Sequence, residues 1–403
     1  MPPTITAILA GLFGGVGVLT GIYWIIVQIR MQRIARFTPS LEDGLDLKTP
    51  SGLVSVIVPA HNEERVIERL AKSVLAQTGV DFELIVVLDR CTDGTLAKLR
   101  AVAGDDQRLR ILEIDECPDD WAGKCHAAAK GVEVASGDWL LFTDADVGFD
   151  PLVLQASASL IEKEDVDLLS AWTSLTAGHW WEFIVQPAAA IALLRIFPPD
   201  RVNNKERPRS FANGQFMVFR TSTYHELGGH EAVKGRLLED LAFAERMHEH
   251  GRRVRIVDAG DMVKTSMYRS LGELLLGWRR ILTDASKRNV PFILRNLILV
   301  LGSGLAPLIC WASISMGIVM AVPPQKSETW WVLVAAGGFG ILSQGITLVR
   351  IYRNGRMPVV GVLGWSIGCI LVAMTLAGAV RDLLTGRPVK WGGREYVLRP
   401  GHR

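Results

Sequence analysis

Long apolar segments occupy both ends of the chain. Residues 5–27 carry no charge and are followed by basic residues. Three more apolar runs lie near the C-terminus, at about 297–319, 330–349 and 359–379. Each run is long enough to cross a bilayer as a helix. A buried helix could imitate one such run, but three in succession with basic residues between them favour membrane spans. The pattern predicts an N-terminal anchor over 1–36 and about three transmembrane helices within 296–380.

The basic residues next to these runs predict an orientation. The first run is longer than a signal-peptide core and has no cleavage site, so Arg30, Arg33 and Arg36 indicate a retained anchor with a cytoplasmic end. Three later spans would then place the C-terminus outside, whereas the basic tail, 381–403, favours the inside. A re-entrant hairpin over 290–322, where glycines and a proline interrupt the run, would reconcile the two.

The middle of the chain alternates between short apolar runs and helical spacing. Leu53–Pro59 and Glu83–Asp89 are typical of buried strands, and each is followed by a helix pattern. Arg110–Ile114 and Trp139–Thr143 continue the series. Two strand–helix units in succession indicate the α/β class with a parallel sheet.

Two carboxylates, Asp144 and Asp146, directly follow the strand Trp139–Thr143. On an extended backbone residues i and i+2 point to the same side, so both side chains can face one cation. Mg²⁺ or Mn²⁺ is commonly held by one or two carboxylates and the oxygens of a phosphate, and open α/β sheets bind ligands at these strand ends. Asp-x-Asp is also common in turns and helix caps, so the spacing alone does not decide between a metal site and a structural role.

The composition limits the classes of protein to which this chain could belong. The residues are 49% hydrophobic, which fits membrane helices, and the net charge of +2 predicts no nucleic-acid partner. Five cysteines without a C-x-x-C pair fit a reducing compartment. The region has acidic residues at its strand ends but no glycine-rich phosphate loop.

Charged residues stand at the start of two predicted helices. Lys124 opposes the helix dipole there, which indicates an anionic neighbour unless the side chain is simply exposed. Glu239 and Asp240 are favoured by the dipole of their helix, and one of them could instead be a general base.

Two segments are amphipathic or mixed. Within 266–295, the leucine-rich stretch Leu271–Ala285 contains Trp278, Arg279 and Arg280, which is typical of a helix at the lipid headgroups. Residues 179–197 mix aromatic and aliphatic side chains, which fits an interfacial helix or a buried one.

These motifs together resemble the inverting glycosyltransferases of family 2, and most closely the membrane-bound branches that act on lipids: hopanoid-associated, carotenoid and ceramide-type enzymes. The motifs are Val56–Glu63, Asp89 with Thr92–Thr95, Gly123-Lys124, Asp144–Asp146, Glu239-Asp240 and the tail Val389–Tyr396. The resemblance implies a GT-A nucleotide-sugar-binding, Rossmann-like catalytic domain over 53–265, joined to the N-terminal anchor by a linker, 37–52.

The resemblance also implies a role for each motif residue. Asp240 would be the catalytic base, with Glu239 beside it. Asp144 and Asp146 would hold Mg²⁺ or Mn²⁺ on the diphosphate. The expected nucleotide-sugar contacts are Pro59, His61, Glu63, Asp89, Asp93, Lys124 and Asp144. Trp278, Arg279 and Arg280 would touch the leaving diphosphate or the acceptor.

The expected reaction is transfer of a single sugar from a nucleotide donor, a UDP-sugar, to a hydroxyl of a hopanoid, carotenoid, sphingolipid or polyprenyl lipid. Many relatives have two acidic residues where this chain has Leu88-Asp89, so one contact to the base is in doubt. The Gln-x-x-Arg-Trp signature of processive synthases is absent, which argues against polymerisation. A processive polysaccharide synthase remains the alternative enzyme, and a silent membrane scaffold or transporter the alternative class. The expected location is a bacterial inner membrane, with the catalytic domain in the cytoplasm.

Overall fold

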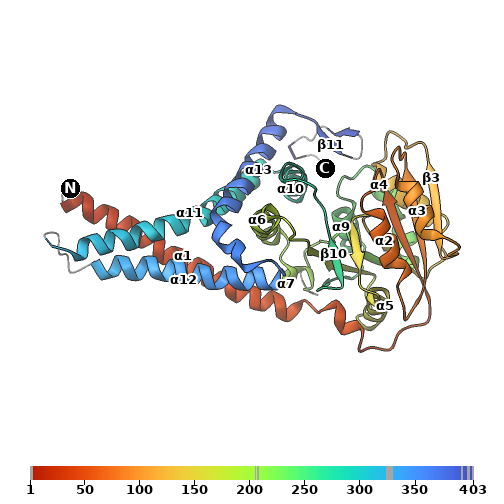
Figure 1. The fold of residues 1–403 in the computed structure, drawn as a ribbon, viewed down its shortest axis with the longest axis horizontal. Coiled ribbons are helices and arrows are strands. Elements are labelled where there is room, and N and C mark those ends of the chain that lie inside the picture. The colour runs from red at the N-terminus through yellow and green to blue at the C-terminus, as the bar shows by residue number, and fades with distance from the viewer. Residues whose placement is uncertain are drawn as a thin grey trace.

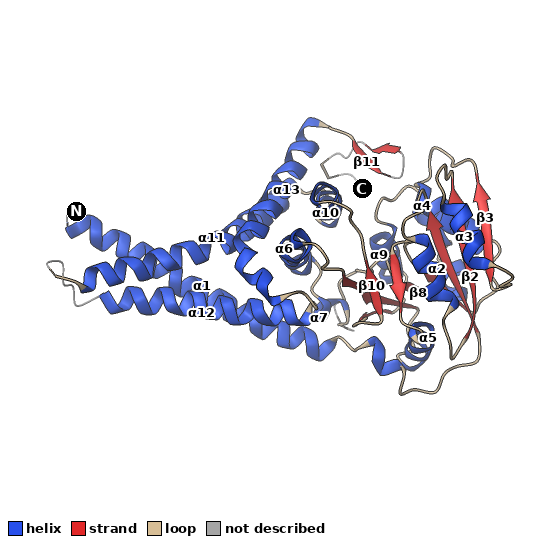
Figure 2. Cartoon of the chain, in the orientation of Figure 1, coloured by secondary structure: helices blue, strands red, loops and turns tan. Residues whose placement is uncertain are grey.

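The chain has an α/β region at one end and a bundle of long helices at the other (Figures 1 and 2). The structure is a computed structural model, and it describes residues 3–204, 206, 208–323, 330–391, 394–396 and 400–401.

A seven-stranded mixed sheet forms the centre of the α/β region, in the order β3-β2-β1-β4-β8-β6-β9. Its strands are β1 (Leu53–Ala60), β2 (Asp81–Asp89), β3 (Leu109–Ile114), β4 (Trp139–Phe142), β6 (Leu168–Trp172), β8 (Met217–Arg220) and β9 (Val254–Asp258). Strand β1 pairs in parallel with β2 and β4, as the alternating pattern predicted, whereas β8 runs antiparallel to β4 and β6.

Helices cover both faces of this sheet. They are α2 (Ile67–Leu75), α3 (Thr95–Ala103), α4 (Gly123–Val132), α5 (Val153–Lys163), α8 (Thr221–Glu226) and α9 (Glu239–Glu249). On β1, Val56 and Val58 pack in the core that contains α2 and α5, while Ile57 packs with Ala127 of α4 and Phe243 of α9. Because successive side chains point to opposite faces, a strand covered on both sides is mostly apolar, and the buried Ser55 of β1 donates to Glu83.

A second, three-stranded sheet borders the predicted carboxylate motif and was not expected. It consists of β5 (Val147–Phe149), β10 (Val263–Thr265) and β7 (Ser174–Leu175). Ser266, just after β10, donates its N–H to the Asp146 carbonyl at 3.1 Å. Strands of two or three residues are too short to show a periodic pattern, which is why the sequence did not reveal them.

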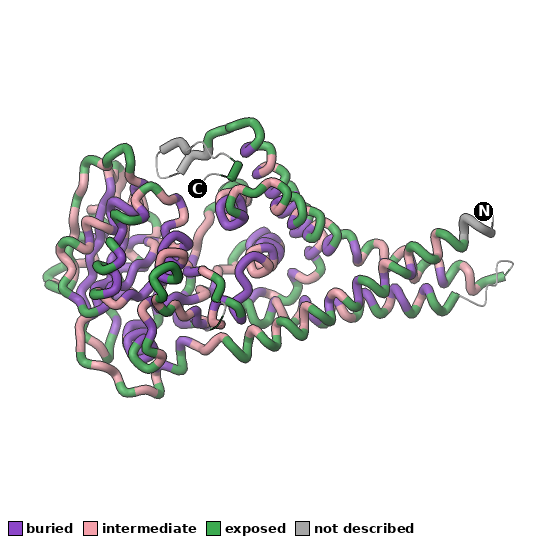
Figure 3. Tube along the Cα trace, turned by 180° about the vertical axis from the view of Figure 1, so that it is seen from behind, coloured by how far each residue is buried: buried purple, intermediate pink, exposed green. Residues whose placement is uncertain are grey.

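Three long helices run side by side away from the α/β region: α1 (Pro3–Phe37), α11 (Val290–Ala321) and α12 (Trp330–Asn354) (Figure 1). Their outer faces expose large apolar side chains, among them Leu19, Ile298 and Leu342, and much of this bundle is drawn as exposed in Figure 3. By length and composition, five segments of the described chain could cross a membrane: Ala7–Phe37, Trp180–Val202, Val290–Ala321, Trp330–Asn354 and Val359–Thr385.

Helix α11 is continuous, so the re-entrant hairpin suggested for 290–322 is wrong. Asn289 caps its start by accepting the Phe292 N–H at 2.9 Å, and Pro307 lies inside the helix. An apolar helix of this length tolerates one proline because breaking the helix would leave several backbone groups without partners.

Helix α13 (Trp365–Thr385) takes a different course from the bundle. Near its start it packs on α6 (Trp180–Ile196) so closely that a Cβ at Gly368 would collide with the Ile184 carbonyl. Near its end it meets α10 (Leu271–Ala285), where Asp382 accepts from Arg279 at 2.9 Å. Its end lies beside the α/β region (Figure 1), so the tail begins on that side.

The short remaining elements include α7 (Pro199–Val202) and the hairpin of β11 (Val389–Trp391) and β12 (Arg394–Tyr396). In the predicted family-like tail, Gly392 and Gly393 lie outside the described residues, as do Arg399 and Arg403.

Candidate active site

One cavity of about 1180 Å³ joins the carboxyl ends of β1 and β4 to the long helices. Most of the predicted site residues line it: Pro59, His61, Glu63, Asp89, Lys124, Asp144, Asp146, Glu239, Asp240, Trp278 and Arg280. These residues come from strand ends and helix starts that are far apart in the sequence. Asp93 and Arg279 are not among the lining residues.

Lys124 joins two of the acidic motifs. From the first turn of α4, its Nζ lies 2.7 Å from Asp144 Oδ1 and 2.6 Å from Glu239 Oε1. Burial alone would lower the pKa of Lys124, but the two carboxylates raise it above its usual range, so the lysine stays charged. The anionic neighbours expected from its position are therefore carboxylates of the protein itself.

The carboxyl groups of Asp146 and Glu63 have raised pKa values, so each is partly protonated near neutral pH. Burial, and then the neighbouring Asp144 carboxylate, raise the pKa of Asp146 to about 8. Burial also raises the pKa of Glu63 to about 7, although Arg269 lowers it. Carboxylates with raised pKa values gather where an added cation would be stabilised.

Asp240 lies at the start of α9 and faces a turn that leads into β8. Its Oδ2 accepts the Gly214 N–H at 2.9 Å, and its Oδ1 accepts the Leu241 N–H at 2.7 Å. Burial, and then the Glu239 carboxylate, raise the pKa of Asp240 to about 7. A carboxyl that titrates near neutral pH can accept a proton during a reaction.

The loops after β1 and β2 are tied together. His61 Nδ1 lies 2.6 Å from the Asp89 carbonyl, and Asn62 Oδ1 accepts the Thr92 N–H at 2.8 Å. Arg90 donates twice to the Asp89 carboxylate, at 2.8 and 2.7 Å. Asp89 is therefore in place but already engaged by an arginine.

Asp93 does not line the cavity, although we expected it to contact the nucleotide sugar. Its carboxylate accepts from the Thr95 N–H at 3.0 Å, from Thr95 Oγ1 and from the Glu64 N–H. These bonds fix the turn that leads into α3 and join it to the loop after β1, which is an ordinary use of an aspartate in a turn before a helix.

The basic residues of α10 divide between two environments. Trp278 and Arg280 line the cavity, whereas Arg279 points to α13 and pairs with Asp382 at 2.9 Å. Neighbouring residues on a helix point in different directions, so Arg279 can contact α13 while Arg280 lines the cavity.

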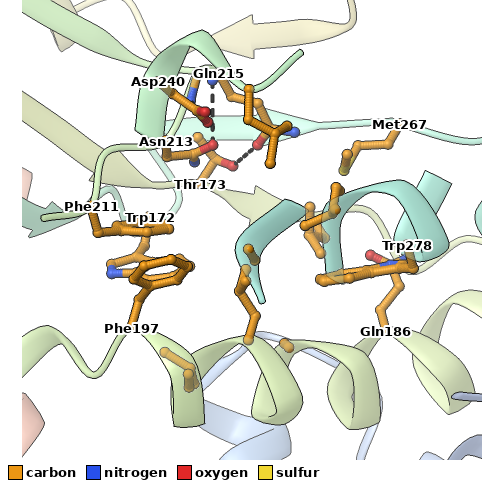
Figure 4. A pocket seen from close by; sticks show the side chains of 18 of the residues that line it. Trp172, Thr173, Gln186, Phe197, Phe211, Asn213, Gln215, Asp240, Met267 and Trp278 are labelled. Atoms are coloured by element: carbon orange, nitrogen blue, oxygen red, sulfur yellow. Dashed lines mark hydrogen bonds between the residues drawn. The ribbon is translucent and has the colours of Figure 1, made fainter. Parts of the chain in front are cut away.

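An aromatic wall, formed by Trp172, Phe197 and Phe211, was missed by the sequence reasoning. The Trp172 and Phe211 rings stack at 4.7 Å and 14°, and Phe197 lies 5.0 Å from Phe211. Figure 4 shows this wall beside Asn213 and Asp240. The three residues come from separate segments, and nothing in their spacing indicated a common surface.

Polar residues next to the wall hold its position. Thr173 Oγ1 donates to Gln215 Oε1 at 2.5 Å, and the Asn213 side chain donates to the Ala171 carbonyl at 2.8 Å. The turn at residues 213–215, whose Gly214 N–H donates to Asp240, is therefore hydrogen-bonded to the end of β6, which carries Trp172 (Figure 4).

The site fits a hard divalent cation. Asp146 Oδ1 is buried and has no hydrogen-bond partner within the described residues, and Asp144 lies close enough to raise its pKa. In the described part of the chain, no three His, Cys, Asp or Glu side chains form a complete metal cluster. Such ions are often held by only two carboxylates together with substrate phosphates, so Asp144 and Asp146 are sufficient for this mode.

The family model and the relatives that this chain resembles are those of glycosyltransferases. Residues 55–228 match the family described as Glycosyl transferase family 2. The 4,4'-diaponeurosporenoate glycosyltransferase of Staphylococcus aureus (strain MRSA252) is 25% identical over 260 residues, which are 64% of this chain and 68% of the relative.

Two solved structures are also similar. A mannosyltransferase from Pyrobaculum calidifontis in complex with GDP-Man and Mn²⁺ is 18% identical, with a TM-score of 0.47, over 95% of this chain and 99% of that one. Glucosyl-3-phosphoglycerate synthase from Mycobacterium tuberculosis in complex with Mn²⁺ and UDP-glucose is 22% identical, with a TM-score of 0.38, over 61% and 81%.

Proposed function

Because residues 55–228 form a glycosyltransferase family 2 domain with the GT-A fold, we propose that this glycosyltransferase moves a single sugar onto a membrane lipid. The donor is a nucleotide sugar of the UDP type. The acceptor atom is a hydroxyl of an apolar lipid of the hopanoid, carotenoid, sphingolipid or polyprenyl kind, and the reaction inverts the anomeric centre.

The observation that carries the proposal is the reach of the cavity. One end is lined by Asp146 and Asp240, and the other by apolar residues of three long helices: Ile26 of α1, Ile191 of α6 and Leu299 of α11. A water-soluble nucleotide and a lipid could thus meet in one cavity. A cavity that served two soluble substrates would not need walls from such helices.

Asp240 acts as the base in this proposal. With a pKa of about 7, much of it is charged at neutral pH, so it can take the proton from the acceptor hydroxyl as the oxygen attacks the sugar. The bonds from the Gly214 and Leu241 N–H groups fix the direction of the carboxylate. Direct displacement at the sugar needs no enzyme nucleophile, and the configuration inverts.

Lys124 and the cation site serve the leaving group. Lys124 holds Asp144 and Glu239 together and offsets their charge. Asp144 and Asp146 would hold Mg²⁺ or Mn²⁺, which when bound stabilises the charge of the departing diphosphate. Arg280, half-buried on α10 and lining the cavity, would add a second positive group for that diphosphate.

The two ends of the cavity bind the two substrates. Pro59, His61, Glu63 and Asp89 would contact the nucleoside, and Asp93 would act indirectly by fixing the loop after β1. The aromatic wall and Trp278 would contact the acceptor lipid, since aromatic faces bury large apolar area.

The same proposal includes the membrane orientation. Helices α1, α11 and α12 cross the bilayer, and α6, α10 and α13 lie at its cytoplasmic face. The basic residues Arg30, Arg33 and Arg36 at one helix end, with Arg350 and Arg353 at another, then lie on the cytoplasmic side with the catalytic domain. The membrane would be a bacterial inner membrane.

The test is product analysis in membranes. Vesicles containing the full chain are incubated with Mn²⁺, bacterial lipid extract and a panel of UDP- and GDP-sugars, and lipids are analysed by mass spectrometry. We expect one lipid to gain the mass of a single sugar with wild type and with Asp105→Asn, an exposed control, but not with Asp240→Asn. Absence of any sugar product would overturn the proposal, and long polymer would favour a processive synthase.

A further inference from the structure

The membrane-side end of the cavity is rich in hydrogen-bond donors. Arg30 of α1, Arg195 of α6, and Arg295 and Asn296 of α11 all line it. We call these four residues the arginine pocket. The proposed donor and base residues lie at the other end of the cavity, so the arginine pocket has no part in the reaction described above.

Arg195 is the best-defined member. Its Nη2 donates to the Tyr23 hydroxyl at 2.5 Å, while its Nη1 is buried and has no partner within the described residues. Asn296 of α11 lines the same cavity and is almost fully buried, and its Nδ2 also has no partner within the described residues. Two residues that line one cavity thus each have a buried N–H group without an acceptor from the described chain.

The arginine pocket also differs in its charge balance from other basic residues of the same region. Arg33 pairs with Asp200, Arg356 with Asp261 and Arg279 with Asp382. Within the described residues, by contrast, Arg30, Arg195 and Arg295 form no ion pair. The acidic residues that line the cavity lie mainly at its other end, where Lys124 already bridges two of them.

The energetics of buried donors predicts which kind of ligand the arginine pocket would bind. A buried donor without an acceptor is costly, and a guanidinium offers its N–H groups in a fork that matches the oxygens of a phosphate or carboxylate. The surrounding wall is apolar, with Ile26, Ile191 and Leu299. A group that is anionic at one point and apolar along its length satisfies both.

We propose that the arginine pocket binds the oxyanion of an anionic lipid, a phosphate or a carboxylate, whose hydrocarbon chain lies in the apolar part of the cavity. Only the further step of naming this lipid as the sugar acceptor rests on the proposed function. Binding itself requires neither a nucleotide nor a divalent cation.

The alternative is general attraction of basic residues to anionic headgroups, which every arginine near a membrane surface shares. Arg36 provides the matched control, because it is exposed on the same helix as Arg30 and does not line the cavity. The two explanations differ in whether Arg195 and Arg36 have equal effects.

The experiment measures lipid retention by native mass spectrometry of the purified full chain, with dioleoyl phosphatidic acid, oleate, dioleoyl phosphatidylcholine or inorganic phosphate as the probe. We expect wild type and Arg36→Gln to retain phosphatidic acid or oleate in preference to phosphatidylcholine. Arg195→Gln should bind at least tenfold more weakly, and Arg195→Lys should fall between, because lysine keeps the charge but not the fork.

Three results would overturn the inference. Arg195→Gln and Arg36→Gln could weaken binding equally, phosphatidylcholine could be retained as well as phosphatidic acid, or inorganic phosphate could bind as tightly as the anionic lipids, which would indicate a free anion. If Arg195→Gln does not fold, Asn296→Ala gives the same test. Loss of sugar transfer with retained lipid binding would contradict only the proposed function.

Discussion

The two ends of the cavity differ in the charge of the side chains that line them. At the reaction end, carboxylates crowd together, and Lys124 and raised pKa values reduce their repulsion. At the membrane-side end, cationic and amide donors stand in an apolar wall with few acidic neighbours among the described residues. In our proposal the first end binds a cation and the leaving anion, and the second binds a lipid. Changes at the first should therefore alter turnover, and changes at the second should alter affinity for the acceptor.

Removal of the proposed base should have the largest effect. Asp240→Asn keeps the size and can still accept the Gly214 N–H, but it cannot take a proton. We expect kcat to fall by about 10²–10⁴-fold, with little change in the KM for the donor. Steady-state transfer of a radiolabelled sugar measures this, with Asp105→Asn as the control. Unchanged turnover would exclude Asp240 as the base.

Loss of the cation site should come next. Asp146→Asn, or chelation of the wild type, should lower turnover by about 10²–10³-fold, the usual effect of removing a group that stabilises developing charge. Calorimetric titration with UDP should show Mn²⁺-dependent binding that the variant loses. UDP binding that is equally tight in EDTA would contradict this assignment.

A smaller effect is expected from pH. Asp240 is active as the carboxylate, and its pKa is about 7, so kcat/KM should rise with pH below 7, about tenfold per unit, and level off above it. Glu63 titrates in the same range, so Glu63→Gln is the necessary comparison. If the slope disappears in Glu63→Gln, the profile reports Glu63 and not the base.

The smallest effect is expected at the aromatic wall. Trp172→Leu keeps an apolar side chain but removes the ring stacked on Phe211. We expect the KM for the acceptor to rise by about three- to tenfold, with the donor KM unchanged, as for loss of one aromatic pair and its area. Trp180→Leu, at an exposed position outside the cavity lining, is the control. Equal effects of the two would contradict a specific wall.

Much of the α/β region could be read from the sequence, because its strands are buried on both faces and end at polar residues. The strands over β1, β2 and β4 are confirmed, and residues 55–228 match the family expected from the motifs. The parts that were missed depend on distant contacts. Strands β5 and β7 are short, and the aromatic wall joins three segments that carry no shared pattern.

The candidate site illustrates the same limit. Lys124 was recognisable because a lysine at a helix start is locally unfavourable and needs an anionic neighbour. The sequence could not distinguish Asp93 and Arg279 from residues that line the cavity. An aspartate that fixes a turn and an arginine paired with another helix look the same in sequence as ligand-binding residues. Only packing shows which of two adjacent side chains faces a cavity.

The central claim is that the lipid reaches Asp240 through the middle of this one cavity. Ala190 of α6 lines that cavity, so Ala190→Trp would fill part of it while every carboxylate of the site stays in the chain. The direct measurement is UDP binding and sugar transfer to lipid on the same preparation of this variant, with Ala190→Ser as the control. The account predicts that UDP binding stays within about twofold of wild type while lipid transfer falls at least tenfold, as expected when bulk blocks an apolar path. Lipid transfer at the wild-type rate would contradict it.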